Sequence, residues 1–192
     1  MVGVMNTLVS ELRPEALAVL FLFRRKNRVS RREISEEIGL GEGSVKRILS
    51  NLKSLGLLDS SNKGHFLTDT GRSLLQKLLE KIEPVSPEEL TEVPKLAKEF
   101  VAILIRDPRE IAVHIVRDAS IRAGASGALI FKRKGERVFL PPGDNDRHEY
   151  SKLKRIMEDG DVLIISFSDD RRHSWLGAIE MTYLLSESLS RD

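Results

Sequence analysis

The chain has 192 residues, of which 41% are hydrophobic and 31% charged, and its formal net charge is +2. This length suffices for two small domains, and no run of roughly eighteen apolar residues predicts a membrane span. Cysteine is absent, which excludes disulfides, thiol catalysis and cysteine-based metal sites. Because the N-terminus has no secretory signal pattern, we expect a cytoplasmic protein without membrane contact.

Basic residues are concentrated in the N-terminal half. Residues 1–83 hold 14 Lys and Arg against 10 Asp and Glu, whereas residues 84–192 hold 17 against 19. The segment 24–63 is the most basic, with 10 basic against 5 acidic residues. Such clustering within a near-neutral chain is typical of a nucleic-acid-binding module, although many charged surfaces are only solvated.

The first two predicted helices have clear starting signals. Pro14 suits the first turn of a helix, and apolar residues follow it at helical spacing. Ser30 and Glu33 have the spacing of a capping box, which predicts the start of the second helix. The glycine-rich segment 39–43 ends that helix, because glycine tolerates positive φ.

A third helix is predicted over about residues 43–55. Its apolar residues fall on one face: Val45, Ile48, Leu49, Leu52 and Leu55. The opposite face is small, basic or amide-bearing, with Gly43, Lys46, Arg47, Ser50 and Ser54 flanked by Ser44 and Asn51. No acidic residue lies between Ser44 and Leu58. Such a helix can enter a major groove without repelling phosphates.

A hairpin and a last helix complete the N-terminal half. Residues 57–59 and 65–67 are predicted as short strands on either side of a polar tip that contains Lys63 and Gly64. Thr68 is predicted to cap the following helix, whose apolar positions extend to Ile82.

Together these segments resemble the winged helix-turn-helix domains of prokaryotic regulators. The resemblance rests on residues 34–49 (ISEEIGLGEGSVKRIL), 52–58 (LKSLGLL) and 67–71 (LTDTG). In that family the glycine-rich segment is the turn, the next helix reads DNA, and the Leu-Thr-x-x-Gly motif follows the wing. The whole chain also resembles an archaeal-type family that joins such a domain to a conserved C-terminal domain of unknown function.

From the predicted helix face and this resemblance we expect a transcriptional regulator whose residues 1–83 bind double-stranded DNA. The residues expected to face base edges are Lys46, Arg47, Ser50 and Asn51. Those expected at the phosphate backbone are Ser44, at the helix N-terminus, with Arg31, Arg32, Lys63 and His65. A homodimer is expected because one winged helix has a small footprint on DNA.

The second half has a different pattern. Prolines break the chain between residues 84 and 95, which predicts a linker there and a second domain over residues 96–192. Strands are predicted over 100–105, 128–131, 137–140 and 161–167, and helices over 108–123, 147–158 and 174–188. This order favours a two-layer α+β domain with a mixed sheet. The archaeal family implies such a fold, related to an insertion domain of tRNA-charging enzymes.

No catalytic, metal or cofactor signature is found. The glycines of segment 39–43 do not match a dinucleotide-binding loop. Asp144 begins a calcium-loop pattern, but Glu149 and Arg155 stand where its glycine and glutamate belong. The 4 histidines are scattered. We therefore expect no enzyme, no cofactor and no metal.

Polar residues at the ends of predicted C-terminal elements form a candidate effector site. They are Arg117, Arg122, Asp144, Asp170, Arg171 and Arg172. The alternative, which we favour, is that they form caps and surface ion pairs, such as an i,i+4 pair between Asp118 and Arg122. Trp175 is expected to be a core residue. The C-terminal domain would then dimerise or bind a small-molecule effector.

Three other functions stay open. Relation to tRNA-charging enzymes favours an RNA-associated module. A winged helix can also act as a protein-interaction adaptor, which predicts no salt-dependent affinity for nucleic acid. An enzyme would have its site among Arg117, Asp144 and residues 170–173.

Overall fold

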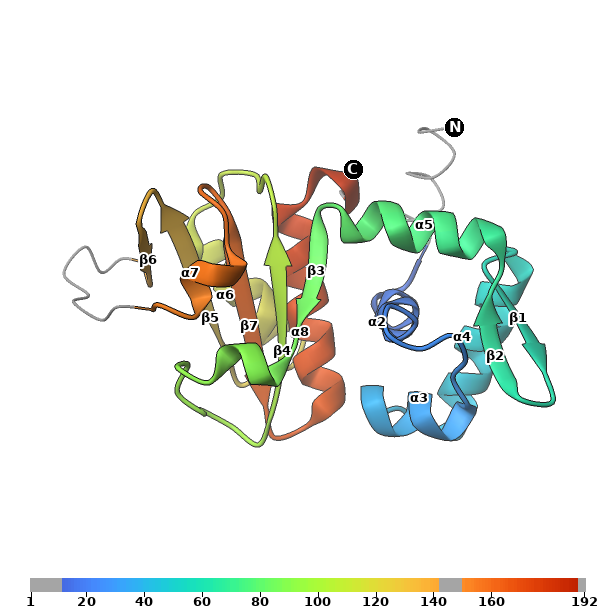
Figure 1. Cartoon of the computed structure of the whole chain (residues 1–192). Coiled ribbons are helices and arrows are strands. Elements are labelled where there is room, and N and C mark those ends of the chain that lie inside the picture. Colours follow the sequence, from blue (N-terminus) through green and yellow to red (C-terminus); the bar gives the residue numbers. More distant parts are fainter. Residues whose placement is uncertain (1–11, 142–149, 190–192) are drawn as a thin grey trace. The chain divides into compact units, whose positions relative to one another are not determined.

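The computed structural model describes residues 12–141 and 150–189 (Figure 1). The chain divides after Leu79 into two compact units. This division comes before the predicted domain end at residue 83, because the last predicted helix stops at Leu79. Among the described residues, no helix is long and apolar enough to cross a membrane.

The N-terminal unit is a winged helix. Its helices are α2 (Pro14–Leu22), α3 (Arg31–Ile38), α4 (Glu42–Ser54) and α5 (Asp69–Leu79), and its wing is the antiparallel hairpin of β1 (Leu58–Ser61) and β2 (Gly64–Leu67). Helix α2 lies at the centre, with residues 16–21 buried. An antiparallel bridge between Val29 and His65 adds a short third segment to the wing. The predicted winged helix-turn-helix fold is confirmed.

A capping box begins α3, and a glycine ends it before the turn to α4. Ser30 and Glu33 make the predicted capping box: Glu33 N donates to Ser30 Oγ at 3.2 Å, and Ser30 N donates to Glu33 Oε2 at 2.7 Å. Helix α3 ends at Gly39, whose φ of 78° is in the left-handed region that glycine adopts without strain. The chain then re-enters a helix at Glu42, and α4 packs against α3.

The C-terminal unit is an α+β domain built on one sheet in the order β3-β4-β7-β5-β6. The strands are β3 (Ile82–Val85), β4 (Glu99–Ile105), β5 (Gly127–Lys134), β6 (Arg137–Phe139) and β7 (Val162–Ser168). Helices α6 (Val113–Arg122) and α8 (Arg171–Leu185) pack on one face of this sheet. The other face carries the 3₁₀ helix η1 (Pro87–Leu90) and the short α7 (Leu153–Ile156), and η2 (Glu187–Leu189) follows α8.

The two-layer α+β class is confirmed, but every strand pair of the described sheet is antiparallel, so the predicted mixed sheet is wrong. The unit β4-α6-β5 predicts two parallel neighbours, and β4 and β5 do run in the same direction. Strand β7 lies between them and pairs antiparallel with both. A β-α-β unit split in this way leaves no parallel neighbours.

The predicted linker over residues 84–95 is also wrong. Residues 82–85 form edge strand β3, in which Ile82 pairs with Ile105. Pro84 is tolerated there because an edge strand can lack one ladder donor. Ser86 and Glu89 form a second capping box at η1, and Leu90 is buried in the core beside the sheet. Segment 80–95 therefore belongs to the second unit.

The C-terminal helices differ from prediction at their ends. Helix α6 begins at Val113 instead of residue 108, because Arg109 N donates to Leu185 O at 2.7 Å and holds the preceding loop in an irregular path. Helix α8 begins at Arg171, before the predicted residue 174, because the Asp170 side chain caps it by accepting from His173 N. Only α7 is seen within the predicted helix 147–158, and residues 147–149 lie outside the described residues.

Candidate nucleic-acid interface

Helix α4 presents the predicted face to solvent. Val45, Ile48, Leu49 and Leu52 are buried in the N-terminal unit. Lys46, Arg47, Ser50 and Asn51 are exposed, and Ser44, in the first turn of α4, is partly exposed. Within the described part of the chain, no hydrogen bond or ion pair engages the side chains of Lys46 and Arg47. We call Ser44, Lys46, Arg47, Ser50 and Asn51 the reader face.

Other predicted cations lie on α3 and on the wing. Arg31 and Arg32 are exposed in the first turn of α3, and Lys63 is exposed at the wing tip. Arg32 is engaged, because its Nε lies 2.8 Å from Glu36 Oε1. The charge of Arg32 is therefore partly neutralised, whereas no ion pair with Arg31 or Lys63 occurs among the described residues.

The structure reveals two further cations that fasten the wing. Arg28 Nη1 donates to Ser61 Oγ at 2.7 Å, and its guanidinium lies 4.8 Å from the centre of the Phe66 ring, a cation–π contact. Lys53, near the end of α4, donates to Ser60 Oγ. We did not predict either role. The signal for Arg28 is its place beside Val29, whose strand character becomes clear only once it pairs with His65.

His65 does not belong to the exposed set, so its predicted phosphate contact is wrong. Its exposed fraction is only 6%, because the alternation along β2 turns His65 and Leu67 inward and Phe66 outward. Its backbone pairs with Val29 in both directions, at 2.9 and 3.0 Å. Burial lowers the pKa of the imidazole, and the charges of Lys53 and Arg31 lower it further.

The predicted effector residues that the structure describes in the C-terminal unit have different roles. Asp170 caps α8, and Arg171 Nη2 lies 2.8 Å from Glu99 Oε2, so these two have structural roles. Arg117, on α6, is partly buried, and Arg122 and Arg172 are exposed. Asp144 lies outside the described residues.

The favoured alternative of caps and ion pairs is confirmed for Asp170 and Arg171, but not throughout. No ion pair joins Asp118 to Arg122 in the described structure. Trp175 is only partly buried, so its predicted place in the core is not fully realised.

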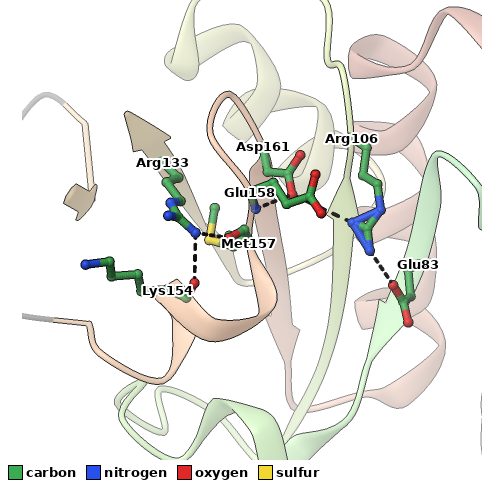
Figure 2. Close-up of polar contacts among 7 residues, drawn as sticks. All are labelled: Glu83, Arg106, Arg133, Lys154, Met157, Glu158 and Asp161. Atoms are coloured by element: carbon green, nitrogen blue, oxygen red, sulfur yellow. Dashed lines mark hydrogen bonds and ion pairs between the residues drawn. The ribbon is translucent and has the colours of Figure 1, made fainter. Parts of the chain in front are cut away.

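A polar cluster around the buried Asp161, at one end of the sheet, was not predicted (Figure 2). Arg106 Nη2 lies 2.9 Å from Glu83 Oε2, and its Nη1 lies 3.7 Å from Asp161 Oδ2. Asp161 is only 4% exposed and accepts from Glu158 N at 2.8 Å. Burial raises the pKa of Asp161, while the Glu158 amide and Arg106 act in the opposite direction.

Arg133 completes this cluster as a helix cap. Figure 2 shows its guanidinium reaching the carbonyl oxygens of Lys154 and Met157, where α7 ends. A cation at this position satisfies carbonyl groups that the helix leaves unpaired. The cluster therefore joins β3, β4, β5 and α7 and has a structural role. Among the described residues, no group of His, Asp and Glu is arranged to hold a metal.

The fold and the reader face define a class of protein: a winged helix-turn-helix unit joined to an antiparallel α+β domain. Residues 14–73 match the family described as PH0730-like, N-terminal domain, and residues 96–185 match a domain of unknown function, DUF4443. Among solved structures, the hypothetical protein PH0730 from Pyrococcus horikoshii OT3 is 31% identical, with a TM-score of 0.71. The match covers 91% of this chain and 93% of that one.

The chain therefore belongs to the PH0730-like family, and it combines that N-terminal domain with DUF4443. The search among curated proteins gave no match. The predicted archaeal-type pairing of an N-terminal domain with a domain of unknown function is thus confirmed, and the role of the protein must be argued from its surface.

Proposed function

We propose that this protein is a DNA-binding transcriptional regulator whose α4 reads the major groove. The observation that carries the proposal is the reader face. It has two exposed cations without a partner among the described residues, beside hydroxyl and amide groups, and it lies on the side of α4 opposite the buried apolar residues. A surface with that composition is suited to phosphate and base-edge contacts.

Each group of the interface has a distinct role in this proposal. Lys46 and Arg47 donate to guanine O6 and N7, and Asn51 pairs with adenine. Ser44 and the free N–H groups of the first turn of α4 hold a phosphate. Arg31 and Lys63 contact the backbone on either side. Arg28 acts indirectly, because its bond to Ser61 sets the position of the wing.

The C-terminal unit serves dimerisation or effector binding in this proposal. A single winged helix covers few base pairs, and two-fold pairing of half-sites raises both affinity and specificity. The protein would work in the cytoplasm, where its DNA target lies.

The test is binding of the intact protein to random-sequence duplex DNA across a salt series. We compare wild type with the double variant Lys46→Ala with Arg47→Ala, which removes two positive charges from α4. On random-sequence duplex, where the cognate bases are rare, Lys46 and Arg47 contact phosphates instead of guanines. The log–log slope should therefore fall by about 1–2 units in the variant, because each lost phosphate contact removes roughly 0.9 of a counterion. Both residues are exposed, so unfolding free energy should change by less than about 0.5 kcal/mol each.

The matched control is Lys95→Ala with Lys98→Ala, which removes the same charge from exposed positions of the C-terminal unit. Its salt slope should stay at the wild-type value. A wild-type affinity that does not depend on salt, or equal losses in both double variants, would contradict the proposal. Tighter binding of structured RNA than of duplex DNA in the same assay would favour the RNA-associated alternative.

A further inference from the structure

The C-terminal unit contains a cavity of about 700 Å³ at the end of the sheet where β5 meets the start of α6. Its lining residues all belong to this unit. Small-molecule sites typically measure roughly 300–1,000 Å³. The volume therefore suits a ligand of metabolite size, and none of the predicted effector residues that the structure describes lines it.

The inner wall of the cavity is apolar. Ile130 on β5 and Val116 on α6 line it and are almost fully buried, at 2% and 1% exposed. Val162 at the start of β7 and Phe139 on β6 extend this wall. Because such a surface cannot offer hydrogen bonds, it favours the apolar body of a ligand.

Two lysines follow Ile130 along β5 on the same face. Residues 130, 132 and 134 alternate with those facing α7, so Lys132 and Lys134 continue the row that Ile130 begins. Within the described chain, no hydrogen bond or ion pair engages either side chain. Lys132 is partly buried, and Lys134 is exposed. An apolar wall that leads to two available ammonium groups is suited to a molecule with one anionic end.

The other charges around the cavity are engaged or lie at its exposed rim. Lys81 Nζ lies 3.0 Å from Asp107 Oδ2, and Arg106 is paired with Glu83. The carboxylates without a partner in the described structure are Glu80, Glu110 and Glu158, all of them exposed. These rim carboxylates disfavour a polyanion, so a single anionic group is the better fit.

The loop that borders the cavity is held in place from both ends. Asp107 adopts a φ of +54° and pairs with Lys81, and Arg109 N donates to Leu185 O at 2.7 Å. These contacts keep residues 107–112 out of α6. The wall is therefore preformed, which lowers the ordering cost of binding.

We propose that this cavity binds a small molecule with an apolar body and a single carboxylate or phosphate group, which Lys132 and Lys134 hold. That the ligand acts as an effector of DNA binding rests on the proposed function, whereas the binding itself does not.

The test uses the full chain and a fluorescent probe of this chemistry, 8-anilinonaphthalene-1-sulfonate, with uncharged N-phenyl-1-naphthylamine as its neutral counterpart. In Lys132→Met, which keeps the length of the side chain, the Kd of the anionic probe should rise about tenfold, the effect of losing one charge-assisted hydrogen bond. The Kd of the neutral probe should stay within about twofold. Ile111→Trp, on the bordering loop, should weaken both probes by reducing the cavity.

The matched control is Lys95→Met, because Lys95 borders a separate apolar groove of about 220 Å³ beside Phe100. This variant should bind both probes as wild type does. Displacement of the anionic probe by phenylacetate or by phenyl phosphate then distinguishes a carboxylate ligand from a phosphate ester. Equal loss of both probes in Lys132→Met, loss in Lys95→Met instead, or displacement by neither competitor would overturn the proposal. No DNA is present, so these results are independent of the salt-series test.

Discussion

His65 shows how one buried side chain can make the stability of the winged helix depend on pH. The imidazole is packed beneath the wing, and its Nδ1 is buried without a hydrogen-bond partner among the described residues. Burial and the nearby charges of Lys53 and Arg31 lower its pKa, so the folded unit favours the neutral ring. The unfolded chain binds a proton near the usual pKa of about 6.5.

We predict that the N-terminal unit loses stability as pH falls through the unfolded pKa of His65. Above that value both states are neutral at this residue, and below it only the unfolded state gains the proton until the lower folded pKa is reached. The free energy of unfolding of the N-terminal unit is measured by urea unfolding, followed by hydrogen exchange of peptides from residues 14–79. The measurement spans about 2 pH units, from pH 7.5 to 5.5. In His65→Gln this part of the pH dependence should disappear, and an unchanged dependence would contradict the prediction.

At the scale of elements, the wing and α5 meet through backbone contact at Gly71. A Cβ added to Gly71 would lie 2.1 Å from the carbonyl oxygen of Leu57, a distance that no side chain can occupy. The Thr68 hydroxyl, which caps α5, donates to Gly56 O and accepts from Gly71 N at 3.1 Å. The Leu-Thr-x-x-Gly motif therefore joins helix to wing by a cap and a close approach.

We predict that Gly71→Ala destabilises the N-terminal unit by about 2–3 kcal/mol, although alanine is normally the better helix former by roughly 1 kcal/mol. Gly43→Ala is the matched control, because nothing lies within 4 Å of a Cβ at Gly43, also inside a helix. That control should be neutral or slightly stabilising. Urea unfolding followed by circular dichroism measures the stability of both variants. Equal changes in the two midpoints would show that helix propensity, not the close approach to Leu57, determines the effect of Gly71→Ala.

For the whole molecule, the division into two compact units leads us to expect that each unit has its own stability. The sheet of the C-terminal unit packs closely on α8 at Gly177, where an added Cβ would lie 2.3 Å from Ser166 Oγ and 2.5 Å from Ser120 Oγ. These two hydroxyls already bond each other at 3.0 Å in the core. Space at this junction of α6, β7 and α8 is therefore too small for a methyl group.

We predict that Gly177→Ala destabilises the C-terminal unit by about 1–3 kcal/mol, the usual range for overpacking. Hydrogen exchange in the full chain should quicken within residues 80–189, while residues 14–79 keep their wild-type protection. Faster exchange throughout both units would instead show that the chain unfolds as one cooperative body.

Local patterns were enough to predict the N-terminal unit and the reader face. The apolar residues of α4 repeat at helical spacing, so Lys46 and Arg47 had to face away from the core. The capping box at Ser30 likewise depends on residues three apart. His65 was misplaced because we weighed its charge, whereas its alternation with Leu67 already indicated the buried face.

Long-range contacts decided what the sequence alone could not. Insertion of β7 between β4 and β5 made the sheet antiparallel, and pairing of Ile82 with Ile105 turned a predicted linker into a strand. The bond from Arg109 to Leu185 shortened α6 and left the loop beside the cavity. Sequence by itself determined the N-terminal helices, the wing and the reader face, because periodicity and capping act between near neighbours. Strand order, the burial of Asp161 and the cavity depend on residues far apart in the chain, so only the tertiary structure decided them.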